Sequence, residues 1–425
     1  MTRSLDQVEP VVHSATPSPR VNRLSGEVVY LYAFDIAYEL PRLPVPELLG
    51  QPIGQFVVDA SKRAPRQLSF YRPQMIRLPP LERLGPGGRV WIDRTVKFLP
   101  VGAISITVRV PFQAGRVEDL VAYHDLRFSD GTYLYDEVRQ LAEDVRRALE
   151  PYAIRPVKQL GDEEAYTVFC IHAPIVAPGG DGEGEAPAEP SSEPSSLMET
   201  QRRGSAGASP SRTPSSTIST ESWMHTRRRE IASLLTEEPD PQHLSEQEAD
   251  ESTAKHFSYY DKDVVVIDWD AALIVDEPKY VDEILYIMEL ANLQLAELEA
   301  YDRILDDAVL RSYQDLRTRR VRSWASAGVQ RELREIRVDL ARLSDELSNI
   351  TKFFGDWHLA RIYKGLSDRF HLGDWHRTID EKLKTLDDLY QILRADQNNR
   401  WMLILEATIV LLFIVDLLAI FVWKK

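Results

Sequence analysis

The chain has 425 residues, of which 44% are hydrophobic and 28% charged, and its formal net charge is −15. A length and composition of this kind are typical of a folded chain with roughly two or three domains. The acidic balance excludes a protein that coats nucleic acid over its whole surface. The single cysteine, Cys170, excludes an intramolecular disulfide framework.

The first 25 residues read MTRSLDQVEPVVHSATPSPRVNRLS. They contain no apolar run of the kind that a secretory signal needs. They also carry acidic residues and lack helical periodicity, which disfavours a mitochondrial transit peptide. The sequence therefore predicts a disordered tail over residues 1–25, and it predicts that residues 1–400 stay in the cytosol.

Residues 26–275 show the pattern of an α+β domain. The apolar run EVVYLYAFDI is followed by VWIDRTVKFL and AISITVRVPF, and the last of these alternates apolar and polar residues as a strand does. An amphipathic helix is expected at about 134–149. The next apolar run contains Cys170, whose thiol we expect to be buried and structural. The stretch FSYYDKDVVVIDWDAALIVDEP predicts a hairpin that completes the sheet.

Residues 176–222 differ sharply from their surroundings. They are rich in Pro, Ser and Gly and have almost no large apolar residues. A segment of this composition cannot bury enough apolar surface to offset its chain entropy. We predict a disordered insert that interrupts the α+β domain, followed by two short helices in RRREIASLL and LSEQEADESTAKH.

Residues 276–400 are predicted to form a helical stalk. Apolar residues recur at alternating intervals of three and four from Leu333 to Trp357, a pattern typical of a coiled coil and also of an intramolecular helical bundle. One break is expected near residues 370–375. If the chain reverses between the segments 328–354 and 374–400, the two helices run antiparallel.

Residues 401–423 are predicted to form a transmembrane helix that anchors the protein by its tail. The apolar stretch corresponds to about 33 Å of helix, against a hydrocarbon core of about 30 Å, and a tryptophan stands at each end. Glu406, Phe413 and Asp416 follow one seam of this helix. An acid inside a bilayer is costly, so the seam is expected to pack against another such helix, most simply that of a second copy.

The sequence contains none of the common nucleotide-binding, hydrolase or zinc-protease motifs. One motif, GDWH, occurs at 355–358 and again at 373–376. Two Asp-x-His sets could in principle supply four metal ligands. We favour the alternative, in which they are two helix starts with Gly and Asp as cap residues and Trp as a core anchor. We predict no catalytic residue, no cofactor and no metal ligand.

Arginines gather around the SWASAG stretch that follows Thr318. A solvated helical tip explains such a cluster, and contacts with lipid phosphates or with an RNA-rich partner are sharper alternatives. An antiparallel stalk would bring the cluster to the membrane surface, where anionic lipid attracts basic side chains. The residues expected to contact lipid or a partner are Arg317, Arg319, Arg320 and Arg322.

The order of features in the second half resembles the "required for meiotic nuclear division" family. The resemblance covers about residues 250–425 and rests on FSYYDKDVVVIDWDAALIVDEP, ILYIMELANLQLAELEAYDRILD, FFGDWHLARIYKGLSDRFHLGDWHRTIDEKLKTLDDLYQIL and the acid-bearing terminal segment. It implies an α+β head, a coiled-coil region and one C-terminal transmembrane helix. Eukaryotic members sit in the mitochondrial inner membrane and support translation there. This chain looks more like a bacterial member, which implies the bacterial inner membrane.

The predicted fold class is therefore an α+β head, a long antiparallel helical stalk and a single C-terminal transmembrane helix. The predicted function is a non-enzymatic, tail-anchored scaffold or adaptor that recruits a protein partner from the cytosol. The alternative is an oligomeric membrane assembly whose acidic seam lines an ion or proton path, and an enzyme comes third. The expected partners are membrane lipids, further copies of the chain and an unknown protein, without direct nucleic-acid binding.

Overall fold

The computed structural model describes residues 23–56, 73–85, 88–161, 163–172, 219–318, 334, 338 and 357–423. Within these ranges, the side chains of 315–318, 390, 392–400, 417 and 420–422 are not described. Most of the predicted tail, most of the predicted insert and nearly all of the periodic segment from Leu333 to Trp357 therefore lie outside the described residues.

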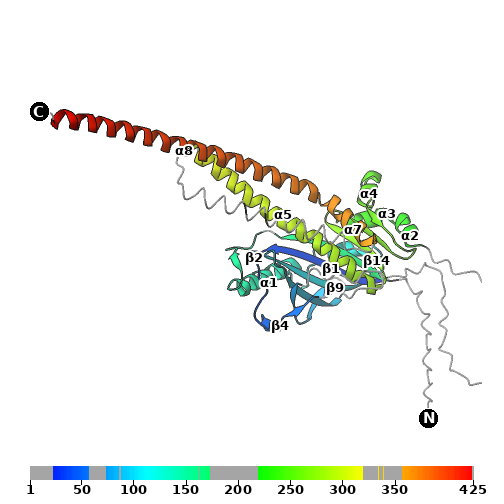
Figure 1. Cartoon of the computed structure of the whole chain (residues 1–425). Coiled ribbons are helices and arrows are strands. Elements are labelled where there is room, and N and C mark those ends of the chain that lie inside the picture. Colours follow the sequence, from blue (N-terminus) through cyan, green and yellow to red (C-terminus); the bar gives the residue numbers. More distant parts are fainter. Residues whose placement is uncertain are drawn as a thin grey trace, which may run out of the picture.

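A mixed sheet of ten strands forms the centre of the molecule (Figure 1). Its strands follow the order β12-β13-β14-β11-β1-β9-β8-β6-β5, and β7 pairs separately with β8. The bounds are β1 Leu24–Asp35, β5 Gly54–Gln55, β6 Gln74–Arg77, β7 Leu81–Gly85, β8 Gly88–Phe98, β9 Ala103–Ala114, β11 Glu164–His172, β12 His256–Phe257, β13 Val264–Ile267 and β14 Ala271–Asp276. Two small pairs complete the strands: β2 Ala37–Glu39 with β10 Ile154–Pro156, and β3 Glu47–Leu48 with β4 Gln51–Pro52.

Helices cover both faces of the sheet. They are η1 Glu118–Tyr123, α1 Leu134–Leu149, α2 Thr220–Thr226, α3 Arg228–Leu235, α4 Glu246–Ser252, α5 Pro278–Thr318, α7 Trp357–Arg369 and α8 Leu372–Trp423. The central strand β1 shows why both faces are needed, because its side chains alternate between two separate cores. Val28 and Tyr30 pack with η1, α1 and α3, whereas Val29 and Leu31 pack with α5, α7 and α8.

The strands on the two sides of the predicted insert belong to one sheet. β14 lies parallel to β11, with Cys170 opposite Ile274. β13 and β14 form the antiparallel hairpin that the sequence predicts, and the Cys170 thiol is fully buried, as predicted. The predicted insert, 176–222, overlaps the start of α2, because Ser219 caps that helix.

A buried ion pair ties α5 to the sheet. The ammonium group of Lys97 on β8 donates to a carboxylate oxygen of Glu289 on α5, and Ser105 on β9 donates to the other oxygen at 2.5 Å. Both charged side chains are only 7% exposed. Lys97 also lies over the ring of Phe56, 3.9 Å from its centroid. The three polar groups therefore satisfy one another between the sheet and α5.

The helices α5 and α8 lie side by side and extend away from the sheet (Figure 1). Residues that come later in α5 contact residues that come later in α8. Gln294 of α5 contacts His376 of α8 at 3.1 Å, and Asp302 of α5 binds Lys382 of α8 at 2.7 Å. This register makes the two described helices parallel. The antiparallel pair that the sequence predicts, 328–354 with 374–400, stays a prediction, because nearly all of 328–354 lies outside the described residues. The structure places α5 beside α8 instead.

Among the residues that the structure describes, no helix is both long enough and apolar enough to cross a membrane. The segment in question is the end of α8, a single helix that runs from Leu372 to Trp423. It also carries Glu406 and Asp416. This finding overturns the predicted transmembrane helix at 401–423.

The expectations that depended on that helix fail with it. They are the tail-anchored, single-pass topology and the inner-membrane localisation. The predicted fold class is wrong as a whole, since the structure has a large mixed sheet of ten strands with helices on both faces.

Two carboxylates meet where the start of β11 lies against α5. Burial, and after it a hydrogen bond and charge repulsion from Glu299, together raise the pKa of Glu164 to about 8, against the attraction of Arg303. Asn292 fixes the backbone here by donating to the Glu164 carbonyl at 3.0 Å. Glu164 therefore holds a proton in the folded protein at pH 7.

The raised pKa predicts a pH dependence of stability. The folded pKa of Glu164 lies above the unfolded value, so its contribution to stability is complete below about pH 4.5 and is lost as the pH rises through about 8. Glu164→Gln keeps the neutral form at every pH. We expect this substitution to raise the free energy of unfolding at pH 9 by about 1–2 kcal/mol, a figure reduced for solvent screening because the side chain is partly exposed. At pH 5 the free energy of unfolding should change little.

Denaturant titrations at pH 5, 7 and 9 measure this effect, with Glu47→Gln, an exposed carboxylate on β3, as the control. A Glu164→Gln variant whose stability falls with pH as steeply as that of the original chain would contradict it.

Candidate functional site

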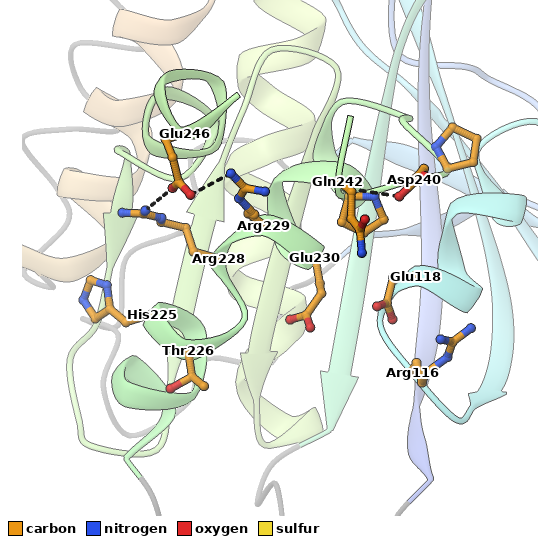
Figure 2. A pocket seen from close by; sticks show the side chains of 12 residues that line it. Arg116, Glu118, His225, Thr226, Arg228, Arg229, Glu230, Asp240, Gln242 and Glu246 are labelled. Atoms are coloured by element: carbon orange, nitrogen blue, oxygen red, sulfur yellow. Dashed lines mark hydrogen bonds and ion pairs between the residues drawn. The ribbon is translucent and has the colours of Figure 1, made fainter. Parts of the chain in front are cut away.

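A polar cleft of about 910 Å³ lies on the side of the sheet that carries α2, α3 and α4 (Figure 2). We call it the charged cleft. It is lined by Arg116, Glu118, His225, Thr226, Arg228, Arg229, Glu230, Pro239, Asp240, Pro241, Gln242 and Glu246.

Short capped helices hold the walls of the charged cleft. Ser219 accepts a hydrogen bond from the Ser222 backbone at the start of α2, and Ser245 accepts one from Glu248 at the start of α4. Such caps stabilise helices of this length, which are marginal alone. The apolar face of α3 packs into the core. As a result, the charged side chains of its first turn face the cleft.

One wall of the charged cleft has its positive charges already paired. Arg228 donates to Glu246 at 3.0 Å and also pairs with Asp250, while Arg229 donates to Glu246 at 2.6 Å. Figure 2 shows both guanidinium groups directed at the same carboxylate. These two arginines link α3 to α4 and offer little uncompensated positive charge.

The other wall brings together two acids. Glu118 from η1 and Glu230 from α3 each have one buried carboxylate oxygen, Oε2, without a hydrogen-bond partner among the described residues. Burial raises the pKa of Glu230. The charge of Arg227 opposes this rise and that of Glu118 adds to it. Figure 2 shows the two carboxylates on the same side of the cleft. This wall is therefore the part of the cleft with unsatisfied negative charge.

The residues selected from the sequence lie elsewhere. Glu406, Phe413 and Asp416 are all exposed on α8, with Phe413 71% exposed. Arg317 belongs to the end of α5, where side chains are not described, and Arg319, Arg320 and Arg322 lie outside the described residues. The structure brings none of the described members of this set to the charged cleft.

The two GDWH histidines have different surroundings. His358 is buried beside the ring of Tyr259, with 5.6 Å between ring centroids, and lies 3.9 Å from Asp263. His376 contacts Gln294 on α5 at 3.1 Å. Gly355 and Asp356 lie outside the described residues. The described geometry gives each histidine its own structural contacts.

Sequence reasoning missed the charged cleft because its charges look like ordinary solvated helix surfaces. One signal was present. The basic run at Arg227–Arg229 stands close in sequence to the acidic run EQEADE at 246–251, and opposite charges on neighbouring short helices tend to pair. The approach of Glu118 from a distant part of the chain could not be read from the sequence.

Comparison with known proteins identifies the relationship of the sheet domain. The family model described as "Uncharacterized protein MJ0711, N-terminal domain" matches residues 25–203 and 211–281. These residues are more than half of the chain and include every residue that lines the charged cleft. No solved structure gives a significant match.

The chain is similar to a Methanocaldococcus jannaschii protein described as "Uncharacterized protein MJ0711". The two are 24% identical over 192 residues, which cover 45% of this chain and 59% of that relative. The predicted membership of the "required for meiotic nuclear division" family is wrong. It rested on a strand pair followed by periodic helices and an apolar terminal segment, an order that unrelated chains share. The chain belongs to the family of the MJ0711 N-terminal domain.

Proposed function

We propose that the protein is a non-enzymatic adaptor whose sheet domain binds a partner protein by taking a basic segment into the charged cleft. The observation that carries this proposal is the pair of buried carboxylate oxygens of Glu118 and Glu230 in the wall of the charged cleft, which have no hydrogen-bond partner among the described residues.

The chemistry of that wall selects a cationic ligand. A buried carboxylate oxygen without a donor costs roughly 1–3 kcal/mol, and more when the group is charged. An arginine guanidinium supplies two parallel N–H donors to a carboxylate and keeps its charge at all working pH values. An arginine or lysine side chain placed between Glu118 and Glu230 would satisfy both oxygens at once.

The charge of the whole chain supports the same choice. A net charge of −15 attracts basic partners over long range and raises their rate of association. Arg228 and Arg229 are occupied by Glu246, so they offer little to a phosphate backbone. A basic protein segment fits the cleft better than a nucleic acid does.

Binding of short probe peptides tests this function. We expect an arginine-rich peptide to bind the full chain and a glutamate-rich peptide of equal length not to bind. The Glu118→Gln/Glu230→Gln variant should weaken binding at least tenfold by fluorescence anisotropy, since two charge-assisted hydrogen bonds are each worth about 1.5–3 kcal/mol. The interaction should also weaken as salt rises.

The matched control is Glu47→Gln/Glu82→Gln, which removes the same charge from β3 and β7, away from the residues that line the charged cleft. An equal loss of binding in the two double variants would mean that net charge alone attracts the peptide. That result would overturn the proposed site.

A second part of the scaffold role is self-association through the end of α8. Large apolar side chains are exposed there on every side of the helix, which is unusual for a surface that stays in water. They are Trp401, Met402, Leu403, Ile404, Leu405, Ile409, Val410, Leu411, Leu412, Phe413, Ile414, Val415, Leu418 and Trp423. We propose that the same helix of further copies covers this surface, so that several sheet domains are presented together.

A further inference from the structure

A cluster of three metal-ligating side chains lies beside the charged cleft and is not used by the proposed adaptor function. Glu221 and His225 come from α2, and His256 comes from β12. One ligand atom from each lies within 4.8 Å of the other two. We infer that these three residues bind a divalent transition-metal ion such as zinc.

The local structure explains why the three side chains converge. Glu221 and His225 are four residues apart, which places them on the same face of α2. The opposite face of α2 is anchored by the buried side chains of Trp223 and Met224. The backbone N–H of Thr220 donates to the Asp261 carbonyl at 2.9 Å, which fixes the start of the helix near the strand that carries the third ligand.

His256 is held in the orientation that a metal ligand needs. Its Nδ1 lies 3.0 Å from the backbone carbonyl oxygen of Thr253. A carbonyl oxygen can only accept a hydrogen bond, so Nδ1 carries the proton and Nε2 keeps its lone pair. Metal-ligating histidines generally donate their other ring nitrogen in this way. Pairing of His256 with Val266 on β13 fixes the backbone beneath the ring.

The supporting carbonyl is itself fixed. Thr253 is 3% exposed and ends α4, where its hydroxyl donates to the Ala249 carbonyl at 2.7 Å. The ring centroids of His225 and His256 are 5.7 Å apart at an angle of 86°. The two rings lie edge-on to each other, and one ring nitrogen of each lies within 4.8 Å of the other and of a Glu221 carboxylate oxygen.

The distances suit a small ion. Metal–ligand bonds of about 2.0–2.2 Å in a tetrahedral site place ligand atoms about 3.3–3.5 Å apart. The ligand atoms lie up to 4.8 Å apart, and small side-chain rotations would bring them to the shorter spacing. Glu221 and His225 are exposed on α2, so their side chains have room to rotate. Two imidazoles with one carboxylate favour zinc, cobalt or iron(II) over magnesium or calcium, which prefer oxygen ligands.

Among the described residues the site has three protein ligands, and it borders two cavities. His225 and Thr226 line the charged cleft and also a second cavity of about 470 Å³ with Ser219, Glu221 and Ser222. Three protein ligands with one position open to solvent are the arrangement of catalytic zinc sites, whereas structural sites have four protein ligands. An ion held here would carry an exchangeable water, or a ligand group supplied by whatever enters the cleft.

Metal titration of the full chain, purified without a histidine tag, tests this inference. By calorimetry we expect one equivalent of Zn²⁺ and of Co²⁺ to bind per chain, and Mg²⁺ not to bind. Bound Co²⁺ should show the strong visible absorption of four-coordinate cobalt. His225→Asn and His256→Gln should each weaken Zn²⁺ binding at least 100-fold, and Glu221→Gln at least tenfold.

His243→Asn is the matched control. This exposed histidine also lies near two carboxylates, 3.4 Å from Glu238 and 3.6 Å from Asp240, but it has no second histidine in its described ion pairs. Circular dichroism of each variant checks that the fold is kept. The proposed site would be overturned if His225→Asn and His256→Gln left the Zn²⁺ stoichiometry and affinity unchanged. It would also be overturned if His243→Asn weakened Zn²⁺ binding as much as they do. Because the peptide-binding test uses Glu118 and Glu230, the two proposals can fail separately.

Discussion

Replacing Glu289 by alanine is expected to lower the free energy of unfolding by about 3–5 kcal/mol. The substitution leaves the Lys97 ammonium group buried beneath α5 without its counterion, and it also removes the acceptor of the Ser105 hydroxyl. The free-energy cost of burying an unpaired charge is much larger than the net stabilisation that a buried ion pair gives. Removing one partner is therefore more destabilising than removing both.

Two controls separate this effect from the loss of any ion pair on α5. Asp282→Ala removes the partner of Arg109 on the same helix, but Asp282 is 59% exposed, so the cost should stay below about 1 kcal/mol. Lys97→Met/Glu289→Leu removes both charges at similar volume and should recover most of the lost stability. Urea titrations measure all three. If Glu289→Ala cost no more than Asp282→Ala, the ion pair would not hold α5 to the sheet.

Ending the chain after Arg400 is expected to change the protein from a self-associated state to a monomer. Each large apolar side chain of the α8 end contributes roughly 1.5–3 kcal/mol when it is fully buried. Covering five of them would give roughly 10 kcal/mol, which is comparable with the 4–15 kcal/mol that association costs in lost freedom. A contact that uses more of the helix surface is therefore needed, as in an assembly of several copies.

Analytical ultracentrifugation of the full and shortened chains measures this directly. Phe413→Asp should weaken the assembly, because it buries a charge at the predicted seam, whereas Lys384→Asp, at an exposed polar position of α8, should leave it intact. A full chain that sediments as a monomer at tens of micromolar would contradict the proposed self-association.

Local patterns predicted local structure well. The amphipathic spacing between residues 134 and 149 matches α1, Leu134–Leu149, because one face of that helix packs on the sheet. The alternation in AISITVRVPF matches β9. The break near residues 370–375 matches the end of α7 at Arg369 and the start of α8 at Leu372.

The arrangement of these elements could not be predicted in the same way. Lys97 and Glu289 stand 192 positions apart, and nothing in the periodicity of either segment pairs them. The parallel course of α5 and α8 depends on the path of the chain between them, which an apolar repeat does not specify. The charged cleft and the three metal-ligating side chains are likewise formed by contacts between segments whose own patterns read as solvated surface.

The parallel pairing of β11 with β14 has a consequence for synthesis of the chain. Until β14 emerges from the ribosome, β11 is an edge strand whose backbone groups and apolar face await a neighbour. Such an edge pairs readily with other chains, and long-range pairing of this kind forms slowly. β11 therefore stays open to pairing with other chains until residues 271–276 have been made.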